Sequence, residues 1–400
     1  MRSIIIGIVI GCVIGVMFGA TVVAPRLENA DSHLSGTKKA PIKTATIGDA
    51  IEQATRAIAA PETPVAMPPA SRQRSVVHWR MASAYPDALP LLGNLASRVG
   101  RNLWNVSDGG MEIKFSGPGS LVPVNGMFDA VSSGAIDAAF GAVDLWAGKA
   151  AALNLFAAIP FGPQSEEYLA WMYFGGGQDA LNKIYHSFDV HGVLCGMTPP
   201  KASGWFRREF TSPEDLKGLR MSSQGLGALV WQKLGVLTQE LEEEDIFLAF
   251  EDGKIDAAEF SVPSVDLKLG FNDVASHYYF PGWQQPVTLH NLIINKDKWD
   301  SLPKSRQSQV EAVCGDNVRH GMAEGEAMQY EALKELTAKG VKVHRWSTPI
   351  LSALEAAWQD VQADQSTADS DFRRIWRSLE DFRRNYSTWD ELSRLPKGAD

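Results

Sequence analysis

The tetrapeptide Ile-Asp-Ala-Ala occurs twice, each time after a predicted helix end, a glycine and one further residue. The first copy lies in "SSGAIDAAFG", residues 132–141, and the second in "EDGKIDAAEF", residues 251–260. A helix that ends at glycine and leads directly into a strand is typical of α/β lobes, because glycine readily adopts the left-handed conformation that closes a helix. The repeat predicts two lobes of like design that face one another. The alternative is that two unrelated junctions use the same turn chemistry.

Strands and helices are predicted to alternate along most of the chain, which favours an α/β fold. The folded part is predicted to begin near Val76, where "VVHWRMASAYP" alternates like a strand and then breaks at a proline. From about residue 303 the chain is predicted to be mostly helical, interrupted by the strand "GVKVHRW". Other predicted elements are helices at 165–186, 224–234 and 243–252, and strands at "AIDAAFG", "VHGVLCGM", "LRMS", "VLTQEL" and "KIDAAEF".

The N-terminal segment carries no charge from Ser3 to Ala24, which is long enough for a helix to cross a hydrocarbon core of roughly 30 Å. Its glycines recur every fourth residue, a pattern that permits close packing of membrane helices. Residues 1–27 are predicted to be a signal anchor in the inner membrane. The alternatives are a cleaved signal peptide and lipidation at Cys12. All three place the remainder in the periplasm, although an anchored cytoplasmic domain is also compatible.

Residues 28–75 are rich in Ala, Pro, Thr and Ser, as in "AAPETPVAMPPASRQRS". This composition predicts a flexible linker with a reach on the order of 40 Å. Residues 76–400 would then form the folded domain.

Charge and motifs exclude several functional classes. The net charge of −9 argues against nucleic acid as a partner, because such proteins normally present a basic surface. The chain has no H-E-x-x-H and no G-x-S-x-G motif, and "GAVDLWAGK" lacks the spacing of a phosphate-binding loop. No C-x-x-C motif is present, and Cys195 can pair with Cys314 only if the fold brings them together. These absences favour a binding protein over an enzyme.

A series of short motifs in a fixed order carries a family resemblance. The sequence resembles the solute-binding proteins of tripartite ATP-independent periplasmic (TRAP) transporters, particularly the branch that binds 2-oxo acids and related monocarboxylates. The resemblance extends from about Trp79 to about Trp389. The matching motifs are "WRMASAYP", "FDAVSSGAIDAAFG", "WAGKAAALNLFAAIPFG", "WMYFGGG", "SGWFRREFTSPEDLKGLRM", "LGV", "DGKIDAAEF", "KLGF", "YYFPGW" and "LPKSRQ".

The resemblance implies two α/β lobes, joined by hinge strands, that close on a ligand between them. Lobe I would comprise mainly residues 76–197 and lobe II mainly 198–345, with a long helix spanning both. The C-terminal helices at 348–390 would either exchange between the subunits of a homodimer or pack on their own chain. The resemblance also implies a receptor, not an enzyme, that delivers a small organic solute to a membrane permease.

This sequence differs from the family pattern at the positions that the resemblance assigns to the ligand carboxylate and its cation. Many members place a ligand-clamping arginine where this sequence has Ser222, in "GLRMSSQG". The 2-oxo-acid branch has a glutamine that helps to hold a cation, and here that position is Lys201. An asparagine four residues earlier corresponds to Met197. A lysine offers only hydrogen-bond donors and does not ligate a metal ion in its ammonium form.

Other positions of the implied site keep an acid or change an aromatic residue. A tyrosine pair before "WAGK" is replaced by Asp144 and Leu145. The acid that closes the second Ile-Asp-Ala-Ala strand is kept as Glu259, whereas the tryptophan after it becomes Phe260. Trp283 in "YYFPGW" is a candidate for ligand stacking, with packing inside a lobe as the alternative. The alternative for Lys201 is a solvated loop lysine that points out of the cleft, and the alternative for Glu259 is a strand-end acid on the surface. The alternative for Asp144 is a loop or helix-capping acid.

We therefore predict a ligand site without a metal or other cofactor, in which Lys201 beside Glu259 performs part of the work of the missing arginine and sodium. If sodium is retained, Glu259 is the residue that would ligate it. Two other functions are compatible with the sequence. One is a membrane-tethered sensor or partner-binding module on the same fold, and the other is an enzyme that uses Lys201 and Glu259 as a charge-tuned pair.

Overall fold

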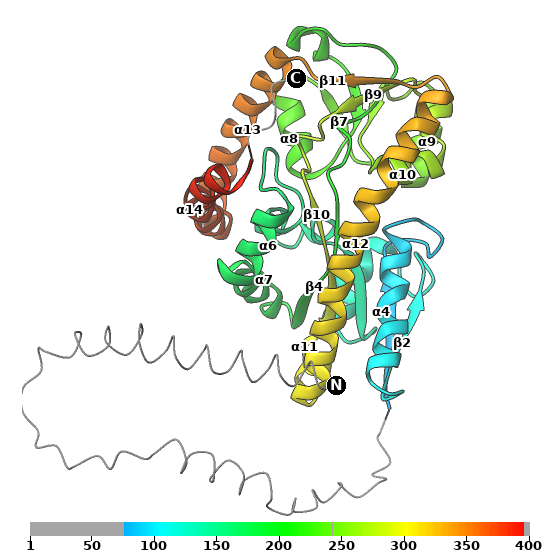
Figure 1. Ribbon diagram of the computed structural model, residues 1–400, viewed down its shortest axis with the longest axis vertical. Coiled ribbons are helices and arrows are strands. Elements are labelled where there is room, and N and C mark those ends of the chain that lie inside the picture. Colours follow the sequence, from blue (N-terminus) through cyan, green and yellow to red (C-terminus); the bar gives the residue numbers. More distant parts are fainter. Residues whose placement is uncertain (1–75, 242, 396–400) are drawn as a thin grey trace, which may run out of the picture. The chain divides into compact units, whose positions relative to one another are not determined.

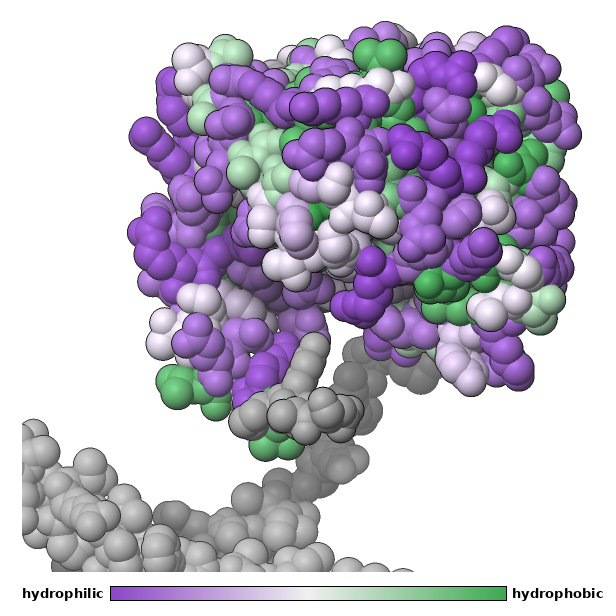
Figure 2. Space-filling view, turned by 90° about the horizontal axis from the view of Figure 1, so that it is seen from above, coloured by the Kyte–Doolittle hydropathy of each residue, from purple (hydrophilic) through white to green (hydrophobic). Residues whose placement is uncertain are grey.

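The computed structural model describes residues 76–241 and 243–395, which belong to one compact unit. The predicted signal anchor (1–27) and linker (28–75) lie outside the described residues. Within the described part, no helix is both long and apolar enough to cross a membrane. Figure 1 shows two halves that are connected by strands and by the long helix α12. On the face shown in Figure 2, hydrophilic side chains predominate and hydrophobic ones are scattered.

The first sheet contains five strands in the order β2-β1-β3-β10-β4. Strand β1 runs parallel to β2 and β3, whereas β10 runs antiparallel to β3 and β4. All eight residues of β10 are buried, as expected for an inner strand covered on both faces. The bounds are β1 (Val77–Ser83), β2 (Met111–Ser116), β3 (Ala138–Ala142), β4 (Val190–Thr198) and β10 (Thr288–Asn295).

The second sheet contains six short strands in the order β11-β9-β5-β8-β6-β7. Strand β5 runs antiparallel to both β8 and β9, and the other pairs in the sheet are parallel. The bounds are β5 (Gly204–Phe206), β6 (Arg220–Ser222), β7 (Leu237–Gln239), β8 (Ala257–Ala258), β9 (His277–Phe280) and β11 (Lys342–Arg345).

Helices cover both sheets. The α-helices are α4 (Gly93–Val106), α5 (Met127–Ser132), α6 (Ser165–Phe174), α7 (Gly177–His186), α8 (Gly225–Lys233), α9 (Glu243–Glu251), α10 (Pro263–Leu269), α11 (Lys296–Asp300), α12 (Lys304–Ala338), α13 (Thr348–Ala368) and α14 (Ser370–Ser393). The 3-10 helices are η2 (Val124–Gly126), η3 (Val143–Trp146), η4 (Ala151–Phe156), η5 (Pro213–Leu216) and η6 (Phe271–Asp273).

The doubled Ile-Asp-Ala-Ala motif has the same structural role in both copies. Each follows a glycine with positive φ, Gly134 at +73° and Gly253 at +64°. In each, the aspartate accepts a hydrogen bond from the backbone N–H of a neighbouring parallel strand and forms an ion pair with the arginine at that position. The pairs are Asp137 with Arg80 of β1, and Asp256 with Arg220 of β6. The two junctions therefore share a strand-pairing device as well as a turn.

Two predicted elements differ from the structure. The helix predicted over 165–186 is two helices, α6 and α7, which are separated at Gly175 and Gly176 because consecutive glycines strongly disfavour a helix. The strand predicted at "KIDAAEF" is reduced to Ala257–Ala258, between the three-residue strands β5 and β6. The strands predicted at "LRMS" and "GVKVHRW" are present as β6 and β11.

Helix α12 spans both halves of the molecule (Figure 1). Its 35 residues correspond to about 50 Å of helix. It packs against α4 and β4 in the first half and against α10 in the second. A Cβ atom at Gly321 would lie 2.6 Å from the carbonyl oxygen of Met197, so only glycine permits this close approach. The helix is therefore held tightly at the point where β4 ends.

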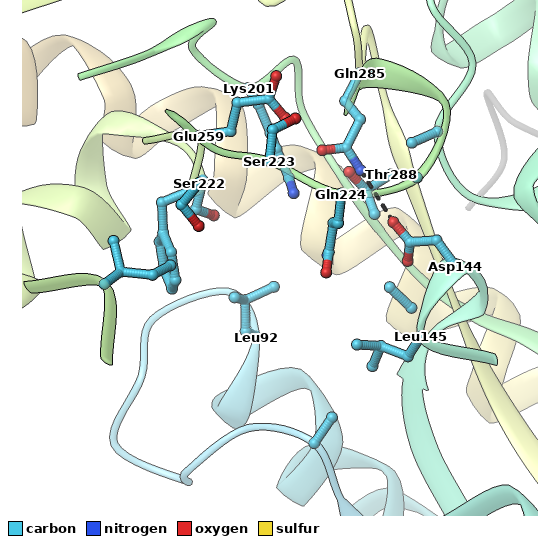
Figure 3. Close-up of a pocket in the computed structure, with 18 of the residues that line it drawn as sticks. Leu92, Asp144, Leu145, Lys201, Ser222, Ser223, Gln224, Glu259, Gln285 and Thr288 are labelled. Carbon is cyan, nitrogen blue, oxygen red and sulfur yellow. Dashed lines mark hydrogen bonds between the residues drawn. The ribbon is translucent and has the colours of Figure 1, made fainter. Parts of the chain in front are cut away.

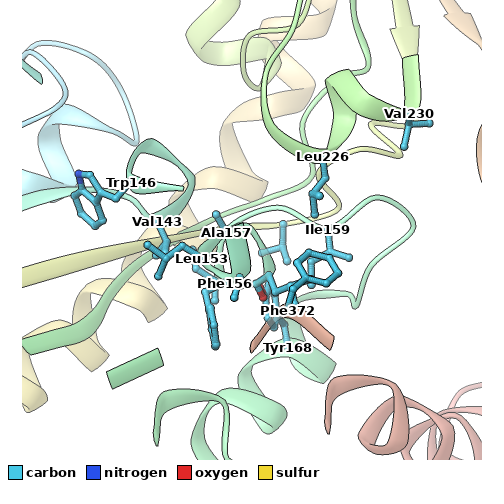
Figure 4. Packing of buried hydrophobic residues seen from close by; sticks show 14 of the residues in the cluster. Val143, Trp146, Leu153, Phe156, Ala157, Ile159, Tyr168, Leu226, Val230 and Phe372 are labelled. Atoms are coloured by element: carbon cyan, nitrogen blue, oxygen red, sulfur yellow. The ribbon is translucent and has the colours of Figure 1, made fainter. Parts of the chain in front are cut away.

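The C-terminal helices pack on their own chain. Helix α13 contacts α8, and α14 contacts α6 and η4. Phe372 and Ile375 of α14 are fully buried, and Figure 4 shows Phe372 among Phe156, Ile159 and Tyr168 of the first half. The sequence left two arrangements open for the helices at 348–390, exchange between subunits or packing on their own chain. In the structure, their apolar side chains pack against the same chain.

Cys195 of β4 and Cys314 of α12 form a disulfide, although they lie 119 residues apart. Both residues are fully buried in the core between the first sheet and α12. Spacing alone did not predict this pair, because only the packing of α12 on β4 brings the two thiols together. Disulfides persist mainly in oxidising compartments, which agrees with a domain outside the cytoplasm.

The double variant C195A/C314A is expected to lower the free energy of unfolding by roughly 2–4 kcal/mol, because the disulfide restricts a long loop of the unfolded chain. Urea unfolding monitored by tryptophan fluorescence measures the change. Dithiothreitol should destabilise the wild type and leave the variant unaffected. A wild type whose urea midpoint does not respond to dithiothreitol contradicts the prediction.

Candidate functional site

A cavity of about 700 Å³ lies between the two sheets, within the range of roughly 300–1,000 Å³ that is usual for small-molecule sites. Its inner wall is built from the ends of strands and from the segments that cross between the sheets. Asp144 follows β3, Ser222 ends β6 and Glu259 follows β8. Lys201 lies on the segment that connects β4 to β5. Ligands in α/β folds bind near such carboxyl ends of strands.

The segments that cross between the sheets are hydrogen-bonded to one another. The backbone N–H of Lys201 donates to the carbonyl oxygen of Gln285 (3.2 Å), which lies between β9 and β10. The N–H of Ala202 donates to the carbonyl of Ser261 (3.1 Å), and the side-chain amide of Gln284 donates to the carbonyl of Ala202 (2.9 Å). The inner wall of the cavity is therefore the same backbone that joins the two halves.

Lys201 is the only lysine or arginine among the described residues that line the cavity. Figure 3 shows its amino group extending into the cavity. Removal from water lowers the pKa of Lys201, and the carboxylates of Asp144, Glu259 and Asp266 oppose that shift. Three acidic side chains therefore act electrostatically on the one ammonium group of the cavity wall.

Glu259 is held by the second sheet from two sides. Its backbone N–H donates to the carbonyl oxygen of Ser222 (3.0 Å), and its carboxylate accepts a hydrogen bond from the Trp231 indole (2.5 Å). Burial raises the pKa of Glu259 to about 7, against the opposing effects of Trp231 and Lys201. Near neutral pH this side chain can therefore hold or release a proton.

Asp144 is the second residue of the 3-10 helix η3, which directly follows β3, and it lines the cavity from the first half. Burial raises the pKa of Asp144, and Lys201 lowers it. The side-chain amide of Gln285 donates to its carboxylate at 3.4 Å, the contact drawn as a dashed line in Figure 3. Acids from both halves therefore contribute to the same charge cluster.

The other predicted site residues divide into two groups. Ser222 and Phe260 line the cavity, and Phe260 packs against Phe271 with ring centroids 5.2 Å apart. Met197 is fully buried in the core, and Trp283 is 3% exposed and stacked on Phe161. Neither Met197 nor Trp283 is among the cavity-lining residues.

Sequence reasoning missed a polar group on β10. His290 is 1% exposed, stacks on Phe140, and lies 3.5 Å from the hydroxyl groups of Tyr85 and Thr198. Burial, with a smaller contribution from Lys201, lowers the pKa of His290 to about 3, so it stays neutral. In the sequence it sits inside the apolar run "VTLHNLIIN", where nothing distinguishes it from a packed core histidine.

Some buried polar atoms of the cavity wall have no hydrogen-bond partner within the described structure. Among them are Oε1 of Gln284 and Oγ1 of Thr288. Because buried polar atoms are normally paired, these two are suited to contact a bound solute.

One group of metal-binding residue types lies elsewhere. Glu209, His277 and His344 bring ligand atoms within 4.8 Å of one another, and none of the three lines the cavity. The two histidines belong to the paired strands β9 and β11. Because they are far apart in the sequence, this cluster could not be predicted from spacing.

The fold and the cavity agree with a sequence comparison. The profile described as bacterial extracellular solute-binding protein, family 7 (DctP), matches residues 86–368. This chain belongs to the DctP family. The family assignment predicted from the sequence motifs is thus confirmed, and DctP proteins are solute-binding proteins that act outside the cytoplasm.

Known DctP-type proteins resemble this one over most of its length. The monocarboxylate 2-oxoacid-binding periplasmic protein of Nostoc sp. (strain PCC 7120) is 33% identical over 320 residues, which cover 80% of this chain and 87% of that protein. The TRAP transporter solute-binding protein of Bordetella bronchiseptica RB50, with calcium and picolinate bound, is 33% identical with a TM-score of 0.77, covering 80% of this chain and 95% of that one.

A TRAP periplasmic solute-binding protein of Pseudoalteromonas atlantica T6c, with sodium and pyruvate bound, is 27% identical with a TM-score of 0.75. The match covers 80% of this chain and 97% of that one. These likenesses confirm the predicted two-lobed α/β solute-binding fold. The chain is a TRAP-type solute-binding protein.

The pKa of Glu259 in this DctP-family receptor predicts a pH-dependent stability. Because its pKa is about 7 in the folded protein instead of the ordinary 4.5, the folded state favours the protonated carboxyl. The resulting stabilisation is complete below about pH 4.5 and is lost as the pH rises through about 7. One pKa unit corresponds to about 1.4 kcal/mol. The loss is therefore on the order of 2 kcal/mol after allowance for the water-facing part of the side chain.

The variant E259Q removes this titration. Between about pH 5 and about pH 8 its free energy of unfolding should fall less than that of the wild type, by that same amount. Urea unfolding at several pH values measures the difference. Parallel pH profiles of the two proteins would contradict the assigned pKa.

Proposed function

We propose that this protein is the periplasmic receptor of a TRAP transporter that binds a small 2-oxo monocarboxylic acid, with the Lys201 ammonium as the counter-charge for the ligand carboxylate. The observation that carries the proposal is the position of Lys201, the only lysine or arginine among the described cavity-lining residues. The named ligands of similar proteins, 2-oxo acids, pyruvate and picolinate, support the ligand class.

The position of the positive charge differs from that expected for the family. The resemblance implies an arginine where this chain has Ser222, which is 4% exposed and lines the cavity. A serine hydroxyl can donate one hydrogen bond but supplies no charge. The charge-assisted contact to the carboxylate therefore passes to Lys201, which approaches the cavity from the crossing segment instead of from β6.

The donor set at Lys201 does not fit the calcium or sodium that accompanies the ligand in the two structures described above. Such hard cations are bound by several oxygen ligands. Lys201 presents N–H donors in place of an oxygen ligand, and its positive charge repels a second cation. We infer that the ammonium group takes the position of the ion, and that Glu259 and Asp144 balance it.

The remaining cavity wall suits a short organic acid. The hydroxyl of Thr288 has no partner in the described structure and can donate a hydrogen bond to an oxygen atom of the solute. Leu92 and Leu145 line the opposite part of the cavity in Figure 3 and would pack against an apolar side chain of the ligand. The proposed receptor releases its solute to membrane permease subunits.

Replacing Lys201 with glutamine should weaken binding of the cognate 2-oxo acid by at least about tenfold, because one charge-assisted hydrogen bond contributes about 1.5–3 kcal/mol. Isothermal titration calorimetry with pyruvate, 2-oxobutyrate and longer 2-oxo acids measures the change. The matched control is K254Q, which removes a surface lysine that is paired with Asp252 at 2.8 Å.

The same titrations test whether ligand binding requires a metal ion. Binding by the wild type should be unchanged after chelation of calcium and replacement of sodium by choline. If binding requires either ion, or if K201Q binds like the wild type, Lys201 does not have the proposed role. Thermal denaturation then serves as a screen for other acids, since a specific ligand raises the melting temperature.

A further inference from the structure

We propose that Lys201 captures its solute covalently, by forming a reversible imine between its Nζ atom and the carbonyl carbon of a 2-oxo acid. This inference rests on the proposed function, because the solute must carry a carbonyl group. It adds a chemical step that simple ion pairing with the carboxylate does not include.

The amino group of Lys201 is accessible and is not held by a direct partner. It extends into the cavity in Figure 3. Within the described part of the chain, no hydrogen bond and no ion pair within 4.0 Å occupies it. Its backbone is fixed on both sides, by the hydrogen bond from Lys201 to Gln285 and the one from Ala202 to Ser261. A nucleophile on a fixed backbone with an unoccupied nitrogen can approach a ligand carbonyl without first breaking a salt bridge.

The surroundings of Lys201 also favour the reactive form of the amine. Only an uncharged amine has the lone pair that attacks a carbonyl, and burial lowers the pKa of Lys201 toward that form. Two surface lysines of this chain have the opposite property. Ion pairs with Asp364 and Asp252 raise the pKa of Lys233 and Lys254, respectively. Lys201 therefore differs from these two lysines in its position inside the cavity and in the direction of its pKa shift.

The reaction balances without an oxidant, reductant or second substrate. The Nζ lone pair attacks the carbonyl carbon, the carbonyl oxygen takes a proton, and the nitrogen loses one, which gives a carbinolamine. A further proton converts the hydroxyl group to water, which leaves as the carbon–nitrogen double bond forms. Water reverses both steps and releases the unchanged acid and the free lysine.

The cavity contains a group that can move these protons. Glu259 lines the same wall and has a pKa of about 7, so near neutral pH it is able both to donate and to accept a proton. The protonated imine keeps one positive charge on the nitrogen. The carboxylates of Asp144 and Glu259, which balance the ammonium group, therefore also balance the bound state.

Trapping with cyanoborohydride tests the inference, because this reagent reduces an imine to a stable secondary amine. The full-length wild type is incubated with pyruvate and cyanoborohydride, and the product is analysed by intact mass and peptide mapping. We expect a single adduct per chain, located on Lys201, with Lys233 and Lys254 as unmodified internal controls. Lactate, which lacks the carbonyl group, should give no adduct and should reduce the yield with pyruvate by competition.

The variant K201R keeps the positive charge but cannot form the adduct, and circular dichroism establishes whether it folds. If K201R does not fold, peptide mapping of the wild-type adduct still decides the question. If calorimetry detects pyruvate binding and no adduct forms, the inference falls and the proposed function stands. If neither binding nor adduct is found with any 2-oxo acid, both fall. An adduct spread evenly over exposed lysines is adventitious and also overturns the inference.

Discussion

A positive charge removed from water, at the junction of the two sheets, governs the arrangement of the cavity. An ammonium group in such a place is tolerated only when negative charge lies close to it. Three carboxylates meet this need at Lys201. One of them, Asp266, is itself held by hydrogen bonds from the Trp205 indole (2.9 Å), the Tyr278 hydroxyl (2.7 Å) and the Ser261 amide (3.0 Å). The electrostatic interaction of Lys201 thus involves an acid that is hydrogen-bonded within the core of the second half.

The same lysine belongs to the backbone that connects the halves. Its own amide, that of Ala202 and the side chain of Gln284 bind the crossing segments together. A solute bound by Lys201, as proposed, would contact the segments that connect the two halves. Helix α12 runs alongside, with Gly321 against the carbonyl of Met197 just before that connection. The proposed ligand contact and the connection between the two halves therefore lie in one small region.

Much of the fold could be predicted because periodicity and glycine position are local properties of the sequence. The repeated Ile-Asp-Ala-Ala motif correctly indicated matching junctions, and the departures at Ser222 and Lys201 directed attention to the cavity. Features that depend on distant contacts were not accessible. The Cys195–Cys314 bond needs α12 to lie on β4, and His290 is recognisable as part of the cavity wall only once β10 is placed between β3 and β4.

That placement of β10 also fixes the order in which the molecule can be completed. The chain leaves the first sheet after β4 at Thr198, builds the strands of the second sheet up to β9, and returns at Thr288 to fill the gap between β3 and β4. A nascent chain that emerges from its N-terminus cannot close the first half until most of the second has followed. Folding intermediates that lack β10 therefore expose the edges of β3 and β4, which are open to wrong pairing.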